Sequence, residues 1–138
     1  MKKLLLLCGA CALIFGITIG NRAILGIRLA HQATLSVFVA HKPTLSMAYE
    51  SVDVFFKLDD FYALRIDTFG SPDIVQDLML QLQAKVVERQ EISGTDLTYG
   101  YSPLLPLKFV RLGRLVNLMI ACARGNVAIG YPLLVGSW

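Results

Sequence analysis

Two cysteines near the start of the chain have the spacing of a redox pair. Cys8 and Cys11 are separated by two residues, as in thioredoxin-like motifs. They lie inside an apolar run that has neither a preceding strand nor a following amphipathic helix, so the context of a redox site is missing. Cys122 is the third cysteine, and it has no partner if the N-terminal run is removed. The cysteines therefore predict neither redox chemistry nor a disulfide framework.

The histidines and one pair of acids are the next candidates for chemistry. His31 and His41 are the only histidines, and each lies in an Ala-His-x-x-Thr-Leu-Ser stretch. Because neither has cysteines or further histidines beside it, the sequence does not predict a zinc site. Asp59 and Asp60 are adjacent, as in a turn whose side chains diverge. We expect solvent-exposed turn residues at all four positions, with no metal ion and no cofactor.

Hydrolysis would need a nucleophile, a general base and a group that orients the base. The chain has no Gly-x-Ser-x-Gly motif, and both histidines lie toward the N-terminus. No catalytic residue is predicted. The sequence favours a non-enzymatic module, and a hydrolase of the cell envelope is the less favoured alternative.

Charge is distributed unevenly along the chain. Residues 43–96 contain ten acidic and four basic residues, whereas residues 97–138 contain four basic residues and no acid. Without residues 1–23 the chain has ten basic and ten acidic residues. This neutral balance argues against a nucleic-acid partner, because phosphate contacts are made mostly by surplus lysine and arginine.

The stretch "SPLLPLKF" combines apolar and basic residues after a strand. A proline cannot donate to a sheet ladder, so Pro103 and Pro106 should end the strand near Tyr101 and leave a stiff apolar loop. The loop either covers the open end of the core or contacts a partner, such as an envelope polyanion or an acidic protein. For the second possibility the predicted partner-binding residues are Leu104, Leu105, Lys108, Arg111 and Arg114.

The first residues are typical of a targeting segment. Lys2 and Lys3 precede an uncharged apolar run from Leu4 to Gly20. As a helix the run would measure about 25 Å, somewhat less than the ~30 Å hydrocarbon core of a bilayer. Residues 1–23 are therefore predicted to be a signal peptide or a membrane anchor, and cleavage is left open. The protein is expected outside the cytoplasm, either secreted or tethered to the cytoplasmic membrane.

The remaining chain divides into a juxtamembrane or linker segment at residues 24–42 and a single domain at residues 43–138. Because hydrophobic residues make up 55% of the chain, a small integral-membrane protein is an alternative. Strands are predicted on both sides of a turn at 41–43 and on both sides of Asp59 and Asp60. Further strands are predicted at 97–101, at 108–112, at 115–123 and after a turn at 124–126. The run at 115–123 should be covered on both faces.

One helix is predicted, over residues 72–89. Ser71 is a suitable N-cap and Pro72 a suitable first helical residue. Apolar residues then recur at helical spacing, and Leu78 and Leu82 should point into the core. We therefore expect one sheet with this helix packed across it.

Three motifs in the second half also resemble a known family. They are Tyr99-Gly-Tyr-Ser-Pro-Leu-Leu-Pro106, Val116-Asn-Leu-Met-Ile-Ala121 and Ile129-Gly-Tyr-Pro-Leu-Leu134. Together they resemble the C-terminal part of the YwmB family, secreted proteins of endospore-forming bacteria. The resemblance covers about residues 66–134, half of the chain, and much of the family's N-terminal portion has no counterpart here. It implies an α+β fold with a curved antiparallel sheet, likened to the TATA-box-binding protein, and a function connected with sporulation. It implies no catalytic residues.

Overall fold

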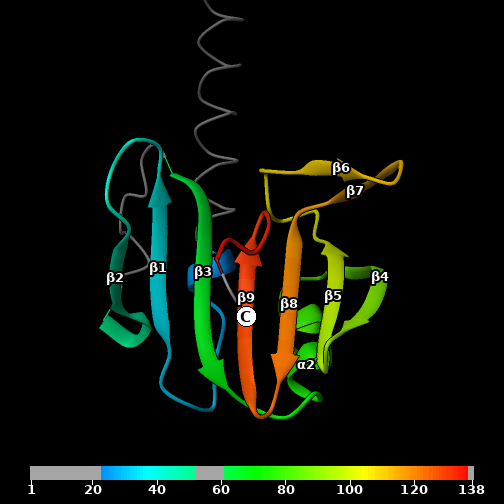
Figure 1. Cartoon of the computed structure of the whole chain (residues 1–138), viewed down its shortest axis with the longest axis horizontal. Helices are drawn as coiled ribbons and strands as arrows, with labels where there is room; N and C mark the ends of the chain where they lie inside the picture. Colours follow the sequence, from blue (N-terminus) through cyan, green and yellow to red (C-terminus); the bar gives the residue numbers. More distant parts are fainter. Residues whose placement is uncertain (1–22, 52–60, 137–138) are drawn as a thin grey trace, which may run out of the picture.

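Seven antiparallel strands make up the body of the computed structural model, which describes residues 23–51 and 61–136 (Figure 1). Their order across the sheet is β2-β1-β3-β9-β8-β5-β4. The bounds are β1 Thr34–Val39, β2 Leu45–Ala48, β3 Phe61–Phe69, β4 Lys85–Ile92, β5 Thr95–Tyr101, β8 Leu118–Ala123 and β9 Asn126–Tyr131. A separate two-stranded sheet consists of β6 (Phe109–Arg111) and β7 (Arg114–Val116). The fold is thus mostly antiparallel sheet with few helices.

Alternation along the strands divides the sheet into two faces. On β3, Leu64 and Ile66 are buried in the main core. Arg65 and Asp67, which alternate with them, lie on the opposite face. β8 differs, because Leu118 to Cys122 are all buried. The prediction that this run is covered on both faces is confirmed for β8.

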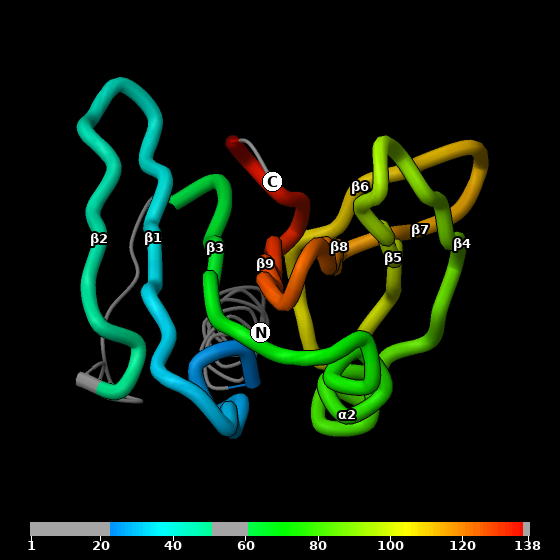
Figure 2. Tube along the Cα trace, turned by 60° about the horizontal axis from the view of Figure 1, so that its bottom comes forward, coloured from blue at the N-terminus to red at the C-terminus, as the bar shows by residue number. Residues whose placement is uncertain are grey.

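Helix α2 (Ile74–Gln81) and the first described residues cover one face of the sheet (Figure 2). The side chain of Gln81 joins these two segments: its Oε1 accepts from the N–H of Arg28 at 2.7 Å, and its Nε2 donates to the carbonyl of Arg28 at 3.1 Å. The hydroxyl of Tyr49, in the 3₁₀ turn η1 (Tyr49–Ser51), contacts the carbonyl oxygens of Ile24 and Ile27 at 3.2 and 3.0 Å. The main core therefore reaches from the sheet to both segments.

The C-terminal strap, residues 132–136, crosses part of the opposite face. Its Leu134 is buried in a second apolar cluster with Leu97, Tyr99 and neighbouring residues. A Cβ atom on Gly130 would lie 2.5 Å from the Cα of Leu134, so only glycine allows the strap to lie this close to β9. The guanidinium of Arg65 donates to the carbonyl of Val135 at 3.0 Å and holds the strap from the side.

The predicted helix over residues 72–89 is wrong in its bounds. Residues 71–73 form a turn, α2 occupies only Ile74–Gln81, and Lys85–Ile92 is strand β4. The helix ends because Gln83 has a left-handed backbone (φ 50°), with hydrogen bonds from its N–H to Leu80 and from the N–H of Ala84 to the carbonyl of Met79. This is the Schellman pattern of helix termination. The expected core positions are confirmed, since Leu78 and Leu82 have no exposed surface.

The segment 24–42, expected to be a linker, belongs to the folded unit. It contains β1, and its Ile24 and Ile27 lie in the main core. Its apolar residues alternate with exposed ones because the segment pairs with β3 and lies over the main core. The strand pair around the turn at 41–43 is confirmed by β1 and β2. The expected strand before Asp59 lies outside the described residues, as do Asp59 and Asp60.

Most of the C-terminal strand predictions are confirmed. The strand at 97–101 corresponds to β5, the one at 108–112 to β6, and the turn at 124–126 joins β8 to β9. The run at 115–123 is not one strand, because it divides into β7 and β8 at Asn117. The side chain of this asparagine is committed to the loop after β5, as described below.

Candidate partner-binding surface

The hairpin of β6 and β7 contains two of the predicted partner-binding residues, Arg111 and Arg114, and a third, Lys108, directly precedes it. Its two strands are joined by Leu112 and Gly113, both with positive φ (50° and 76°). This backbone matches the type I′ turn that joins tightly twisted hairpin strands. Figure 1 shows the hairpin at the upper end of the molecule, running across the ends of β5 and β8.

The inner side of the hairpin is fastened to the main sheet. The Nε of Arg111 donates to Oε2 of Glu88 on β4 at 3.2 Å, and its guanidinium lies 4.2 Å from the ring centroid of Tyr99 on β5. Nη1 of Arg114 donates to the carbonyl of Val87 at 3.0 Å. These contacts fix the hairpin against the edge of the sheet.

The outer side of the hairpin is apolar and exposed. Val110 and Leu115 are cross-strand partners, with 68% and 44% of their surfaces exposed. Leu112, in the turn, is 80% exposed. Lys108 precedes β6 and is also exposed. We call the exposed residues of the hairpin, Lys108, Val110, Leu112, Arg114 and Leu115, the hairpin surface. Arg114 belongs to it by its exposure, although its guanidinium is also bonded to Val87.

The structure divides the predicted partner-binding residues into two groups. Lys108 and Arg114 are exposed and belong to the hairpin surface, and Leu104 beside it is half-buried. Leu105 is only 2% exposed and lies in the main core, so it cannot contact a partner. The positive charge of Arg111 was expected to be unopposed, but Glu88 pairs with it. Strand pairing places β4, which contains Glu88, next to β5 and the hairpin, which explains this difference.

Sequence reasoning missed the apolar members of the hairpin surface. Val110, Leu112 and Leu115 were read as strand residues or as the end of a strand. The stretch Arg111-Leu-Gly-Arg114 contains a usable signal, because a residue followed by glycine between two strand-like runs indicates a two-residue turn. A leucine in such a turn projects into solvent.

A buried asparagine positions the loop that precedes the hairpin. Oδ1 of Asn117 accepts from the N–H of Ser102 at 2.8 Å. Its Nδ2 donates to the carbonyls of Ser102 and Leu105 at 2.7 and 2.9 Å. Both N–H donors and the oxygen of this fully buried amide are therefore engaged in holding residues 102–105 over the core. The sequence left open whether this loop covers the end of the core or contacts a partner, and its geometry matches a loop that covers the core.

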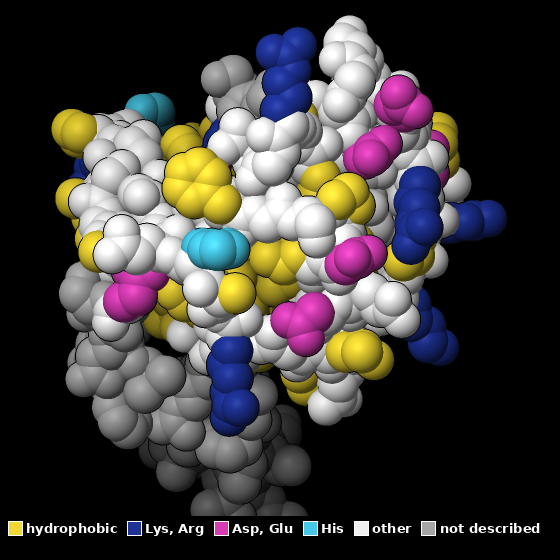
Figure 3. Space-filling model, turned by 90° about the horizontal axis from the view of Figure 1, so that it is seen from below, with side chains coloured by type: hydrophobic (Ala, Val, Ile, Leu, Met, Phe, Trp, Pro, Cys, Tyr) yellow, Lys and Arg dark blue, Asp and Glu magenta, His cyan; other side chains and the backbone are white. Residues whose placement is uncertain are grey.

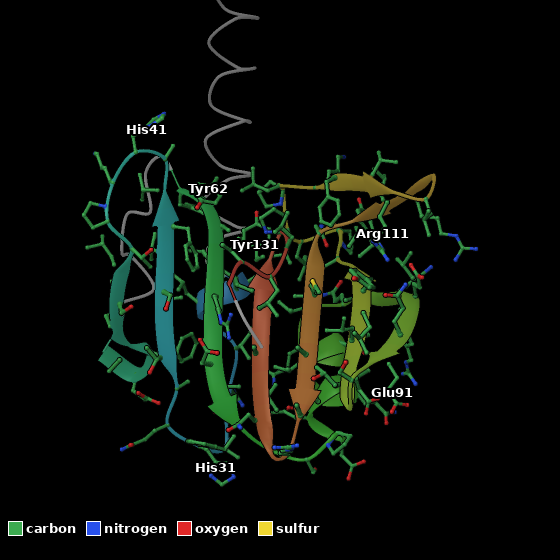
Figure 4. The ribbon with its side chains drawn as sticks, viewed as in Figure 1. His31, His41, Tyr62, Glu91, Arg111 and Tyr131 are labelled. Atoms are coloured by element: carbon green, nitrogen blue, oxygen red, sulfur yellow. The ribbon has the colours of Figure 1, made fainter. Side chains whose placement is uncertain are left out.

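In the described part of the chain, the histidines and Cys122 do not come together to form a reactive site. His31 and His41 lie at opposite ends of the sheet (Figure 4). Burial, and then the nearby charge of Asp96, raise the pKa of the Cys122 thiol, which disfavours the reactive thiolate. Among residues 23–51 and 61–136, no group of three or more histidine, cysteine or acidic side chains is arranged to hold a metal ion.

A hollow of about 780 Å³ lies on the open face of the sheet, beside the strap. Its polar lining includes Arg65 and Asp67, which pair with each other at 2.9 Å, and its floor includes Ala121 and Ala128. The arginine is paired with the aspartate and also bonded to Val135. Glu50, which also lines the hollow, accepts from the N–H of Ala33 at 2.8 Å.

Within the described parts of the chain, no helix combines the length and the apolar character needed to cross a bilayer.

Comparison with protein-family models found no match. Searches of curated proteins and of solved structures also returned no match.

Proposed function

We propose that this protein is an exported, non-enzymatic module of the cell envelope that contacts its partner through the hairpin surface. The observation that carries the proposal is the two-sided construction of this hairpin. Its inner side is held by Arg111, Glu88 and Tyr99, while its outer side leaves Val110 and Leu112 exposed. A fixed element that keeps apolar side chains in solvent beside positive charge suits recognition, because apolar anchors supply affinity and charge supplies steering.

The exported location is proposed from the start of the sequence. Lys2 and Lys3 followed by the apolar run from Leu4 to Gly20 have the order of a signal peptide or an anchor. Retention of this segment would tether the module to the cytoplasmic membrane, and cleavage would release it.

The non-enzymatic character is supported by the separation of the reactive side chains. The thiol of Cys122 is buried, and the two histidines, both exposed, lie at opposite ends of the sheet. Among residues 23–51 and 61–136, none of these three groups has the neighbour that would activate it as a nucleophile or a base.

The relation to the YwmB family, with its curved sheet and a role in sporulation, remains part of this proposal. Of the twenty residues in the three motifs, ten lie on β5, β8 and β9, which are neighbouring strands of one sheet, and the others lie in the loop after β5, around the end of β7 and in the strap.

Two partner classes suit the hairpin surface on charge: an envelope polyanion and an acidic patch on a protein. Lys108 and Arg114 would supply the contacts, whereas Arg111 and Leu105 support the surface from within. The acidic residues elsewhere balance these charges over the molecule, so a nucleic-acid partner is not proposed.

A reporter fused after Trp138 tests the exported location. We expect an enzyme that is active only outside the cytoplasm to be active in this fusion, and one that requires the cytoplasm to be inactive. Carbonate extraction and N-terminal sequencing of the mature chain then separate a tethered from a released protein. Activity of the cytoplasmic reporter would refute export.

A further inference from the structure

The turn of the β6–β7 hairpin contains Leu112, whose left-handed backbone and exposure to solvent are both unfavourable for a leucine. Three hairpins in the described sheets turn through a residue followed by glycine, both with positive φ: Ser93–Gly94, Leu112–Gly113 and Arg124–Gly125. Left-handed backbone is costly for bulky apolar residues and is better tolerated by short polar ones. Two of the three turns use a polar first residue, and only the β6–β7 turn uses an apolar one, which is 80% exposed.

Two positive charges next to this leucine repel each other when no partner is bound. Arg111 and Arg114 are direct cross-strand partners next to the turn, and like charges placed opposite each other on a sheet repel. Glu88 balances Arg111, but the structure records no ion pair to Arg114 or Lys108 in the described residues. An external anion would therefore relieve this repulsion.

The hairpin lies at an end of the molecule from which the described acids are largely absent. Figure 4 places His41, Tyr62 and Arg111 at this end, together with the β1–β2 turn that contains the exposed Lys42. Glu91 lies at the opposite end. Viewed from that opposite end, acidic side chains gather on the side of α2 and the β4–β5 hairpin (Figure 3). Among the described residues, most acidic side chains other than Glu88 thus lie away from the hairpin, although basic side chains lie beside them in this view.

We propose that the hairpin surface docks on an anionic phospholipid bilayer, with Leu112 and Val110 in the interfacial layer and Lys108 and Arg114 at the headgroups. The inference rests on the proposed function, which places the chain at a membrane. A convex apolar tip beside basic residues suits a bilayer, because lipid accepts projecting side chains without a preformed pocket. A hydrophilic polyanion gives Leu112 no apolar environment, and an acidic protein would need a pocket that matches the tip.

A membrane tether would strengthen this docking without any new contact. The apolar run at Leu4–Gly20, if retained, holds the folded residues close to the bilayer and converts docking into an intramolecular step. Modest affinity of a small apolar tip is then sufficient.

Depth-sensitive fluorescence on the full chain tests the proposal. The only tryptophan, Trp138, is replaced by phenylalanine, and Leu112→Trp is introduced in that background. Reconstitution uses brominated phosphatidylcholine vesicles with or without phosphatidylglycerol. The matched control is Arg124→Trp, which places the probe in a turn with the same backbone, between β8 and β9 at the other end of the sheet.

We expect the emission of Leu112→Trp to shift to the blue and to be quenched about threefold more than that of Arg124→Trp when anionic lipid is present. Raising the ionic strength from about 0.1 M to about 1 M shortens the Debye length from about 10 Å to about 3 Å, so quenching should fall. Equal quenching of the two variants, or equal quenching without anionic lipid, would overturn the proposal.

A second variant separates docking from folding. Leu112→Asn places a residue that tolerates the left-handed backbone in the turn, so the hairpin should be at least as stable as before. With Val110→Trp as the probe, Leu112→Asn should reduce quenching severalfold, and Lys108→Ser should reduce it only in anionic vesicles. Unchanged quenching in both variants would contradict the assigned contacts. If the chain resists carbonate extraction while Leu112→Trp stays unquenched, docking is refuted and the proposed function stands.

Discussion

Asn117 determines how the chain passes from the main sheet to the hairpin. Its amide makes three hydrogen bonds to the backbone of Ser102 and Leu105 and has no exposed surface. In addition, the hydroxyl of Ser102 donates to the carbonyl of Leu82 at the end of α2. A single polar side chain in an otherwise apolar run thus joins helix, loop and sheet.

We expect Asn117→Ala to lower the free energy of unfolding by about 3 kcal/mol, because it leaves the N–H of Ser102 and the carbonyl of Leu105 buried without partners. The carbonyl of Ser102 keeps a bond from the N–H of Leu105 at 3.3 Å. Urea denaturation monitored by circular dichroism measures the change. Asn126→Ala is the control, since that asparagine is exposed in the β8–β9 turn and should change stability by less than about 0.5 kcal/mol. A loss of similar size in the two variants would contradict this account of Asn117.

Two buried tyrosines give stability a definite alkaline limit. Burial is the main cause that raises the pKa of Tyr49 to about 12, and likewise the pKa of Tyr131 to about 12. Between pH 10 and 12 the unfolded chain loses these protons while the folded chain keeps them. The folded state is therefore fully stable with respect to these groups below pH 10 and loses stability as the pH rises toward 12.

Tyr49→Phe should reduce this alkaline loss, since it removes one of the two groups. Each tyrosine contributes at most about 1.4 kcal/mol per pH unit, so the slope of unfolding free energy against pH between 10 and 12 should become shallower by up to this amount. Tyr131 and the Cys122 thiol, whose pKa burial also raises, continue to contribute. Urea midpoints at several pH values measure the slope. At pH 8 the same variant should be less stable than the wild type, because the carbonyls of Ile24 and Ile27 lose their partner. An unchanged slope would exclude Tyr49 as a source of the loss.

At the scale of elements, the end of α2 is set by one strained residue. Gln83 adopts φ 50°, a conformation that glycine adopts more readily than any residue with a side chain. We expect Gln83→Gly to stabilise the protein by about 0.5–1 kcal/mol. The control is Gln76→Gly, in the exposed middle of the same helix, which should destabilise it by about 1 kcal/mol. Thermal denaturation should therefore give shifts of opposite sign, and shifts of the same sign would reject the assignment.

This residue also explains why the helix was predicted too long. Val86 continues the apolar spacing of α2, and no glycine or proline marks a stop between Leu78 and Ile92. The stop depends on the pairing of β4 with β5, a contact between elements that the local sequence does not encode. Strands β5 and β9 were predictable because turn residues and prolines mark both of their ends, whereas for β8 only the C-terminal end is marked in this way.

For the candidate surface, the basic residues were visible in the sequence and their partners were not. A single carboxylate on β4 neutralises Arg111, and only the strand order brings Glu88 to that place. The burial of Leu105 likewise follows from the contacts of Asn117, fifteen residues away from Ser102 in the chain. Local sequence predicts which residues are charged or apolar, whereas tertiary pairing decides which of them remain available.

At the scale of the whole molecule, Leu82 tests whether the helix and the sheet form one core. It has no exposed surface and lies in the main core cluster with buried residues of four strands, β1, β3, β8 and β9. We expect Leu82→Ala to cost about 2–5 kcal/mol. Leu80→Ala, on the exposed side of α2 at 72% exposure, should cost less than about 0.5 kcal/mol. Chemical denaturation of both variants gives the comparison, and a small loss for Leu82→Ala would place the helix outside the core.

The position of β9 determines when this protein is able to fold. β9 is the last strand of the chain, yet it lies in the middle of the seven-strand order, between β3 and β8. In the described sheet, β2, β1 and β3 pair with the other half only through β9. Neither half completes the main core until residue 131 is available, whether the chain is leaving a ribosome or a membrane channel. Folding of this unit therefore waits until β9 has emerged, and its rate is limited by the closure of long-range pairs.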